Sequence, residues 1–215
     1  MSSNWSVTLA SVTEEDFTLL SQWVSSNTGI YASGVKSNVS AAEFRQFLDQ
    51  TDEEYLMVCT SDGQAIGAVS SKSAQAPGSY IVGTMIGDSD MWGAGFGLEA
   101  TMLLVGMLFD LKGAHRIEFI CGVFNRRSVE NFCSGLITVE GILRDYYFVD
   151  GAYHDALIGS ILRDEYYAVR EPSEIVPAKE KEAARRIVAD FVEKNPIVPR
   201  DRPAAEATTT ERQRA

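Results

Sequence analysis

Three glycines at alternate positions open a long apolar segment near the middle of the chain. The segment is Trp92-Gly-Ala-Gly-Phe-Gly-Leu-Glu-Ala100, and it follows an apolar, strand-like run over residues 80–86. A glycine-rich turn at a helix N-terminus leaves backbone N–H groups unpaired, with the positive end of the helix dipole behind them, and so suits phosphate or pyrophosphate. The same spacing also occurs where a strand turns sharply into a close-packed helix. Taken alone, the loop leaves both interpretations open.

Two common nucleotide-binding motifs do not fit this loop. A dinucleotide fold needs Gly-x-Gly-x-x-Gly after the first strand of a parallel unit, but here Gly95 and Gly97 are one residue apart and the loop lies mid-chain. A nucleoside triphosphate loop ends in Gly-Lys-Ser/Thr, and no such ending follows. The ligand must therefore be identified from the neighbouring segments.

Composition limits the classes of protein that this chain can be. Its 215 residues suffice for one domain with a full core and a tail, and 45% are hydrophobic, which is typical of a globular protein. The formal net charge of −11 disfavours nonspecific binding to nucleic acid or an anionic membrane, because both need a cationic surface. No apolar run is long enough to span a bilayer, and no secretory signal pattern opens the chain.

The cysteines indicate a reducing compartment rather than a disulfide framework. Cys59 and Cys121 lie in apolar runs, where a free cysteine behaves as a small hydrophobic residue, and Cys133 makes the number odd. No pair has metal-ligand spacing, and the only histidines are His115 and His154. We therefore expect a cytoplasmic protein without a bound metal.

Hydrophobic periodicity predicts an α/β fold of the α+β kind. Strands are expected at 5–9, 55–60, 65–71, 80–86, 116–123, 139–149 and 153–162, and helices after Thr13, after a capping box at Ser40-Ala-Ala-Glu43, at 97–111 and at 127–133. Residues 25–39, rich in Ser, Asn and Gly, are expected to be a loop. This order of elements indicates a mixed, largely antiparallel sheet with helices on both faces.

The chain changes character after the last expected strand. Residues 1–168 form the predicted domain, and residues 169–198 a linker with an extra, C-terminal amphipathic helix that Asn195-Pro196 would end. Its apolar stripe favours packing against its own domain over a dimer contact. Residues 199–215 are rich in Pro, Ala, Thr and Arg and are expected to be disordered.

Four segments, in order, resemble the GNAT superfamily of acyl-CoA-dependent N-acyltransferases, and within it the ribosomal-protein N-terminal acetyltransferases. The resemblance rests on Gly83-Thr-Met-Ile-Gly87; Met91 to Ala100; His115-Arg-Ile-Glu118 with Asn125-Arg-Arg-Ser128; and Ser134 to Arg144, followed by Asp150-Gly-Ala-Tyr-His-Asp155 and Leu162-Arg-Asp-Glu-Tyr166. Three positions depart from the family pattern. Trp92 replaces a Gln or Arg, Ala94 a frequent basic residue, and Leu136 a Phe. The backbone N–H groups of the loop are unaffected by these changes.

The resemblance implies a GNAT-like fold that binds acetyl-CoA or another acyl-CoA as co-substrate, with pantetheine between two diverging strands, 80–86 and 116–123. A bulge near residues 84–86 would present a backbone N–H to the thioester oxygen, where such a donor stabilises developing charge. The implied donor-binding residues are Thr84, Met85, Ile86, Trp92, Gly93, Ala94, Gly95, Phe96, Gly97, Asn125, Arg127 and Ser128. Arg126 is a further candidate for phosphate contact, beside Arg127.

The resemblance also implies catalytic candidates. Asn125 would bind pantetheine, and Ser128 could protonate the leaving thiolate; both residues also suit the cap of a short helix. A general base would take the amine proton. Glu118 and Asp155 are the leading candidates, and Asp88, Asp90 and His154 are others. A water chain is an alternative to any of them.

The resemblance implies that the acceptor is a primary amine of a small molecule or of a protein N-terminus, and that it attacks the acyl group directly in a ternary complex. Residues 25–39 and 146–154 would border its site, and Tyr31, Tyr146, Tyr147 and Tyr153 could line it. Three alternatives stay open: a longer acyl-CoA donor, an aminoacyl-tRNA donor that the net charge disfavours, and a non-catalytic acyl-CoA sensor or scaffold. The protein would be a monomer or a homodimer.

Overall fold

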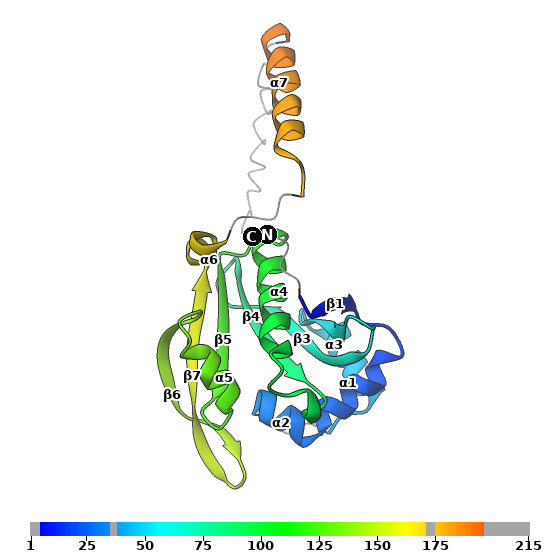
Figure 1. Ribbon diagram of the computed structural model, residues 1–215, viewed down its shortest axis with the longest axis vertical. Helices are drawn as coiled ribbons and strands as arrows, with labels where there is room; N and C mark the ends of the chain where they lie inside the picture. The colour runs from blue at the N-terminus through cyan, green and yellow to red at the C-terminus, as the bar shows by residue number, and fades with distance from the viewer. Residues whose placement is uncertain (1–4, 35–37, 171–174, 196–215) are drawn as a thin grey trace, which may run out of the picture. The chain divides into compact units, whose positions relative to one another are not determined.

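The computed structural model describes residues 5–34, 38–170 and 175–195 (Figure 1). The chain divides into two compact units, Met1–Pro172 and Ser173–Ala215, and each is described by itself. None of the helices in these ranges combines the length and apolar character needed to cross a bilayer.

The first unit is built on one seven-stranded sheet with the strand order β1-β2-β3-β4-β5-β7-β6. Its elements are β1 (Val7–Ser11), α1 (Asp16–Ser25), α2 (Asn27–Ser33), α3 (Ala41–Gln50), β2 (Glu54–Thr60), β3 (Ala65–Ser73), β4 (Ser79–Ile86), a 3-10 turn η1 (Ser89–Met91), α4 (Phe96–Asp110), β5 (Arg116–Gly122), α5 (Arg126–Phe132), β6 (Thr138–Val149), β7 (Ala152–Leu162) and α6 (Arg163–Val169). All neighbouring strands are antiparallel except β4 and β5. The predicted mixed, largely antiparallel α/β fold is confirmed.

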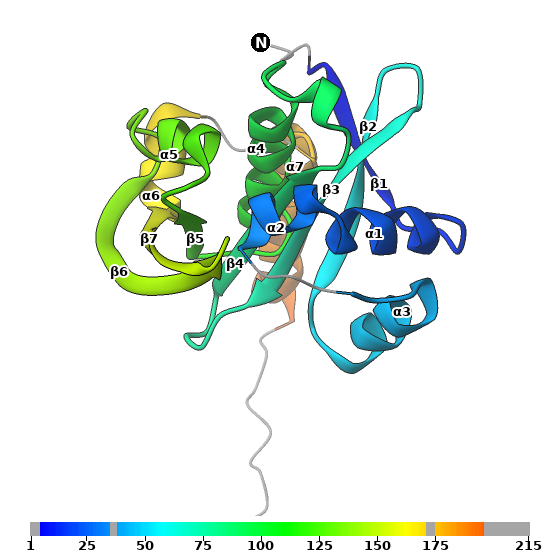
Figure 2. The ribbon, with the colours of Figure 1, turned by 90° about the horizontal axis from the view of Figure 1, so that it is seen from below.

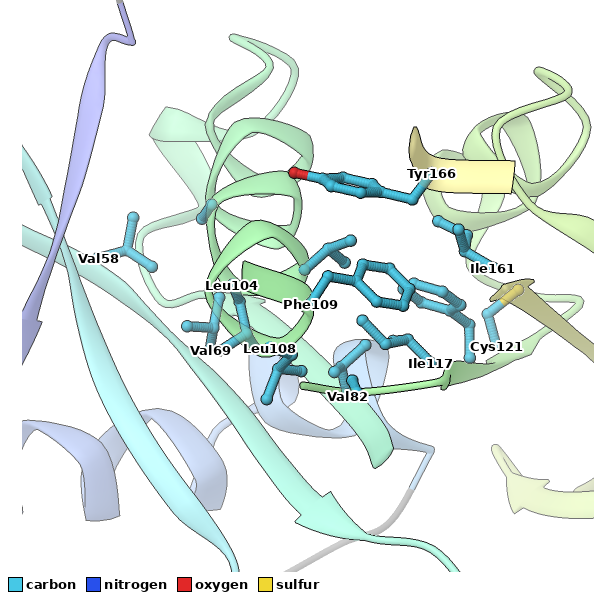
Figure 3. Packing of buried hydrophobic residues seen from close by; sticks show 14 of the residues in the cluster. Val58, Val69, Val82, Leu104, Leu108, Phe109, Ile117, Cys121, Ile161 and Tyr166 are labelled. Carbon is cyan, nitrogen blue, oxygen red and sulfur yellow. The ribbon is translucent and has the colours of Figure 1, made fainter. Parts of the chain in front are cut away.

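Helices cover both faces of the sheet, because residues alternate between two apolar clusters. On β2, Val58 packs with α4, and Met57 packs with α1 and α3 on the other face (Figure 2). The larger cluster surrounds Phe109 of α4, which is fully buried. In Figure 3 the Tyr166 ring of α6 lies above it, with the two ring centroids 4.8 Å apart. This packing fixes α4, and with it the glycine loop at its N-terminus, against the sheet.

The largest error in the predicted local structure concerns the segment before α3. Residues 25–39 were expected to be a loop, but α2 occupies Asn27–Ser33. The Ser26 hydroxyl accepts from the N–H groups of Thr28 and Gly29, and Gly34 ends the helix in the left-handed conformation at φ 71°. These caps outweigh the low helix propensity of the segment. Residues 35–37 lie outside the described residues.

Smaller differences occur at helix ends. Thr13 does not cap α1, which begins at Asp16; instead its N–H and hydroxyl donate to the Asp16 carboxylate at 2.8 and 2.7 Å. The turn η1 and the helix α6 were not predicted. The capping box at Ser40 and Glu43 is confirmed at the start of α3.

Strands β4 and β5 diverge, as the resemblance implied. They pair only from Ser79 to Ile81 on β4 and from Arg116 to Glu118 on β5, although β4 continues to Ile86. The expected bulge near residues 84–86 is absent, because β4 pairs with β3 in unbroken register through Ile86. The gap therefore comes from the separation of two regular strands.

An ion-pair network joins the three neighbouring strands β5, β7 and β6. Arg116 donates to Glu118 at 3.1 Å and to Glu140 of β6 at 2.8 Å, and Ser160 of β7 also donates to Glu140 at 2.9 Å. These bonds, chiefly those from Arg116, lower the pKa of Glu140 from 4.5 to about 2. The network links the edge strand β6 to the centre of the sheet.

We expect Glu140→Gln to remove a pH-dependent part of the stability. The pKa of Glu140 is lower in the folded than in the unfolded chain, so its contribution is complete above about pH 5 and disappears as the pH falls towards 2. Because the side chain is 35% exposed, the contribution is about 1 kcal/mol at pH 7. Urea unfolding of both proteins from pH 7 to pH 3 measures it: the difference should shrink on acidification. Glu130→Gln, which removes a surface pair on α5, is the control; an equal shrinkage there would contradict the assignment.

The second unit contains one described helix, α7 (Ala178–Lys194), which confirms the predicted amphipathic helix. No residue of α7 is buried, and its apolar stripe is exposed at Ile187, Val188, Phe191 and Val192. Packing of this stripe against the first unit stays a prediction. The tail expected to be disordered, residues 199–215, lies outside the described residues.

Candidate functional site

A cavity of about 450 Å³ opens where β4 and β5 diverge. Its walls come from α2, the end of β4, the glycine loop, the first turns of α4, and α5 (Figure 1). It gathers all of the predicted donor-binding residues except the exposed Ala94: Thr84, Met85, Ile86, Trp92, Gly93, Gly95, Phe96, Gly97, Asn125, Arg127 and Ser128. Segments far apart in the sequence therefore meet in one site.

The glycine loop has the backbone geometry of an anion site. Gly93 and Gly95 have φ values of 88° and 89°, a region that side chains other than glycine rarely adopt. Gly95 is the N-cap of α4, so the N–H groups from Gly95 to Leu98 have no acceptor within the helix. A Cβ on Gly95 would meet no atom within 4 Å, so the space above the helix terminus is open. The loop can therefore hold phosphate oxygens on backbone donors.

The end of β4 directs backbone groups into the gap. Gly87 donates to Ile66 of β3 at 2.8 Å, which fixes the alternation along the ladder: odd-numbered residues of β4 bond to β3, and even-numbered ones face the gap. The N–H groups of Thr84 and Ile86 thus face away from β3. The Thr84 hydroxyl bonds to that of Thr101 at 2.7 Å, which donates to the Gly97 carbonyl. This chain of bonds ties β4 to the first turn of α4.

An aromatic and cationic stack closes one wall of the cavity. The rings of Tyr31 and Trp92 stack with centroids 5.0 Å apart, and the Arg127 guanidinium lies 5.6 Å from the Trp92 ring. The Trp92 indole N–H donates to the Ile86 carbonyl at 2.8 Å, which holds the indole in place. Tyr31 was expected near an acceptor; it lines this cavity instead.

Asn125 and Ser128 form the cap of α5. The Asn125 Oδ1 accepts from the Ser128 N–H at 3.2 Å, and its Nδ2 donates to the Tyr31 carbonyl at 3.0 Å. The buried Asn125 side chain thus joins α5 to α2. Ser128 lines the cavity and is positioned by the bond from its backbone N–H to the Asn125 side chain.

A second cavity of about 700 Å³ adjoins the first and shares Ala32, Thr84 and Met85 with it. It lies against the sheet face that carries Ala68, Ser70 and Gly83, below α2, α3 and β6. Tyr146 and Tyr147 line it, whereas Tyr153 is 66% exposed and packs on Phe148; their expected place at an acceptor stays a prediction. Burial raises the pKa of Tyr147 to about 12, so this hydroxyl is a neutral donor at pH 7. Two cavities that meet at β4 can bring two substrates together.

Comparison with known protein families gives a single family match. Residues 6–131 match the family model described as the acetyltransferase (GNAT) domain, which is more than half of the chain. The chain belongs to the GNAT acetyltransferases. Among curated protein sequences, none is similar enough to the chain to count as a match.

Solved structures with the same fold are distant in sequence. Spermidine N-acetyltransferase from Vibrio cholerae, in complex with CoA and spermine, superposes with a TM-score of 0.68 at 19% identity, covering 75% of this chain and 98% of that one. A probable GNAT-family acetyltransferase from Chromobacterium violaceum gives 0.60 at 22% identity, covering 75% and 85%. At these identities the likeness shows the fold of this GNAT domain alone.

The two carboxylates predicted as general bases lie outside both cavities of this GNAT domain. Glu118 is paired with Arg116 in the network described above. Asp155 accepts from the Asp145 N–H at 2.9 Å, where β6 has a bulge opposite it. Asp145 has φ 51°, so the Asp155 carboxylate stabilises this irregular turn of the strand. The roles of both residues as bases stay predictions that this geometry does not favour.

Two of the other base candidates, Asp88 and His154, are also engaged elsewhere, and Asp90 is exposed and lines neither cavity. Asp88 caps η1 by accepting from the Asp90 N–H at 2.9 Å. His154 bonds to the Val149 carbonyl at 3.2 Å and packs on Phe124. Within the described ranges, no three His, Cys, Asp or Glu side chains form a group that could hold a metal ion.

Sequence reasoning missed several residues of the site. Thr28 and Ala32 of α2 line the first cavity, and Glu53 and Tyr55 at the start of β2 line the second. The caps at Ser26 and Gly34 were the available signal for α2. The residues of β2 had no local signal, because only the pairing of distant strands brings them to the cavity.

Proposed function

We propose that this GNAT acetyltransferase moves an acetyl or other acyl group from acyl-CoA to a primary amine by direct attack in a ternary complex. The observation that carries the proposal is the junction of the two cavities at Thr84 and Met85. A donor in the first cavity and an amine in the second would meet there. The N–H groups of Thr84 and Ile86 face the same gap.

The residues of the first cavity suit acyl-CoA. A pyrophosphate fits the open N-terminus of α4, where N–H groups and the helix dipole favour negative charge. Arg127 adds a cation beside Gly93, whose added Cβ would lie 3.3 Å from the guanidinium. The gap between β4 and β5 suits an extended pantetheine chain. The bound co-substrate supplies a thioester, whose acyl carbon is open to attack by an uncharged amine.

The chain's own residues would position the reacting groups and transfer the protons. The amine nitrogen forms a bond to the acyl carbon, the carbon–sulfur bond breaks, and an amide and a free thiol result. The N–H groups of Thr84 and Ile86 would donate to the acyl oxygen, where negative charge develops. The Ser128 hydroxyl would give a proton to the leaving sulfur and regain one from solvent. Since Glu118 and Asp155 are engaged elsewhere, we infer that water carries away the amine proton.

The acceptor class is proposed more broadly than the sequence resemblance suggests. The resemblance to the ribosomal-protein branch points to a protein N-terminus, whereas the fold neighbour from Vibrio cholerae was solved with spermine. The proposal therefore covers amines of small molecules and of protein N-termini. The assembly that carries it out would be a monomer or a homodimer.

Release of free thiol from acetyl-CoA, measured across a panel of amines, tests the proposed function. Turnover with at least one primary amine, and formation of the acetylated amine by mass, are expected. Turnover only with a longer acyl-CoA would show that the donor is not acetyl-CoA but a longer acyl-CoA. If the protein binds CoA but turns over no combination of donor and amine, the proposed catalytic function is rejected. The alternative of a non-catalytic acyl-CoA sensor would then remain.

Arg127→Ala is expected to weaken CoA binding about tenfold, because one charge-assisted contact to phosphate is lost. The dissociation constant for CoA, measured by calorimetry at low and moderate salt, should rise in the variant and depend less steeply on salt. Arg45→Ala is a matched control: Arg45 also lies over an aromatic ring, 5.9 Å from Phe17, and lines neither cavity. Equal affinity of the Arg127 variant and the native protein would assign Arg127 to packing on Trp92 alone.

A further inference from the structure

We propose that the second cavity selects a hydrophobic monoamine, a primary amine carried on an apolar or aromatic body, and discriminates against polyamines. This inference rests on the proposed amine acylation and names the acceptor class for it. Three features of the cavity carry it: the order of side chains along its floor, the character of its walls, and its charge.

The floor of the cavity is a ladder of three cross-strand rows. Strand pairing places Ala68 and Met85, beside the buried Met57, in the row nearest the first cavity, and Tyr55, Ser70 and Gly83 in the next. The same register, extended by one residue on β2, places Glu53 beside Lys72 and Ile81 in the third row. The rows run from the junction with the donor cavity to the far end.

The two charged groups of the cavity lie at that far end. Met85 and Ile81 are four residues apart on β4, which corresponds to about 14 Å along an antiparallel strand. Glu53 and Lys72 are the charged members of the lining within the described residues, and their strand positions face one another. Glu53 is therefore the one carboxylate among the described lining residues, with Lys72 in the same row. Between these two residues and the junction, the described lining residues carry no charge.

The walls between the two ends are apolar and aromatic. Phe44 and Tyr55 pack edge to face at 5.3 Å, and Phe47 lies 6.4 Å from Phe44. Tyr146 and Tyr147 of β6, 4.8 Å apart, form the opposite wall. Burial, and then the charge of Glu53, raise the pKa of Tyr55, so the phenol stays neutral. Such walls gain free energy by covering an apolar or aromatic body.

A polyamine does not match this distribution of charge. Each of its ammonium groups beyond the reacting one would leave water for an apolar wall, and an unpaired buried charge is costly. One carboxylate, already beside a lysine, cannot compensate two or three such groups. A monoamine loses its only charge when it deprotonates for attack, and its body then fills the aromatic section.

Competing acceptors at saturating acetyl-CoA test the proposal. The value of kcat/KM for phenethylamine or hexylamine should exceed that for spermidine, spermine and a glycine-initiated peptide by at least about tenfold. Preference for a polyamine or for the polar peptide would overturn the hydrophobic monoamine and leave the proposed acyl transfer standing. Turnover of no amine would instead reject the acyl transfer.

Two variants at the rim of the cavity localise the effect. Phe47 is 44% exposed, so Phe47→Ala should fold and lower kcat/KM for phenethylamine about fivefold without changing CoA affinity. Phe47→Glu should shift the ratio of rates towards spermidine. Phe148→Ala, at a ring that is 61% exposed and lies outside the cavity, is the control; an equal loss there would contradict the assignment. If turnover is absent, calorimetry of phenethylamine with the CoA complex decides: binding weakened by Phe47→Ala supports the cavity assignment, and no binding overturns it.

Discussion

Gly95→Val is expected to weaken CoA binding by at least about 100-fold while the fold persists. Gly95 has φ 89°, and a side chain in the left-handed region costs roughly 1–2 kcal/mol. Gly95 lines the first cavity, and a Cβ there would meet no atom within 4 Å, so we expect the valine side chain to occupy space that a phosphate would need. Loss of two phosphate contacts there, at about 1.5 kcal/mol each, gives the stated factor. Calorimetric titration with CoA measures it.

The matched control for this variant is Gly63→Val. Gly63 has nearly the same φ, 86°, and an equally empty surrounding, but it lies in the turn between β2 and β3. Both variants should lose similar stability in urea unfolding. Weak CoA binding in the Gly95 variant alone would identify the loop as the phosphate site; native affinity in both would make it a packing turn only.

Most of the fold could be predicted because its signals are local. The capping box at Ser40, the turn at Asp62-Gly63 and the apolar run that becomes α4 each depend on a few adjacent residues, and each is confirmed. The loop prediction for α2 was wrong for a related reason. Its interior has low helix propensity, and its stability depends on packing against α1 and β4, with Gly29 allowing close approach to the Val24 carbonyl.

The two halves of the site differed in how far the sequence could predict them. The residues that we propose to bind the donor form short motifs, such as Asn125 to Ser128, and all but one of them line a single cavity. The second cavity, which we propose for the acceptor, instead depends on strand register, which brings Tyr55 of β2, Ser70 of β3 and Gly83 of β4 to one face. A single sequence does not contain this register. Glu118 had a suitable residue type, but its carboxylate is paired with Arg116.

Ser128→Ala is expected to lower kcat about 100-fold with little change in CoA affinity. A positioned proton donor contributes a factor of that order, and the leaving thiolate is the group that would lose its donor. The helix cap should persist, because Asn125 accepts from the backbone N–H of residue 128, not from its hydroxyl. Ser128→Thr should recover part of the rate. Steady-state kinetics with a fixed amine, together with CoA titration, separates kcat from binding.

The comparison with Ser134→Ala decides whether the effect belongs to the site. The Ser134 hydroxyl also bonds within this short helical region, donating to the Asn131 carbonyl at 2.7 Å, but it lies outside the residues that line the first cavity. Its loss should leave kcat within about twofold, as is usual for a surface substitution. If Ser128→Ala has the kcat of the native protein, Ser128 lines the cavity but takes no part in the reaction. Equal losses of kcat in both variants would show that the rate depends on the structural integrity of α5 and not on the Ser128 hydroxyl. A loss confined to Ser128 makes its hydroxyl the proton donor, since the two variants differ in where the hydroxyl points and not in the cap that Asn125 maintains.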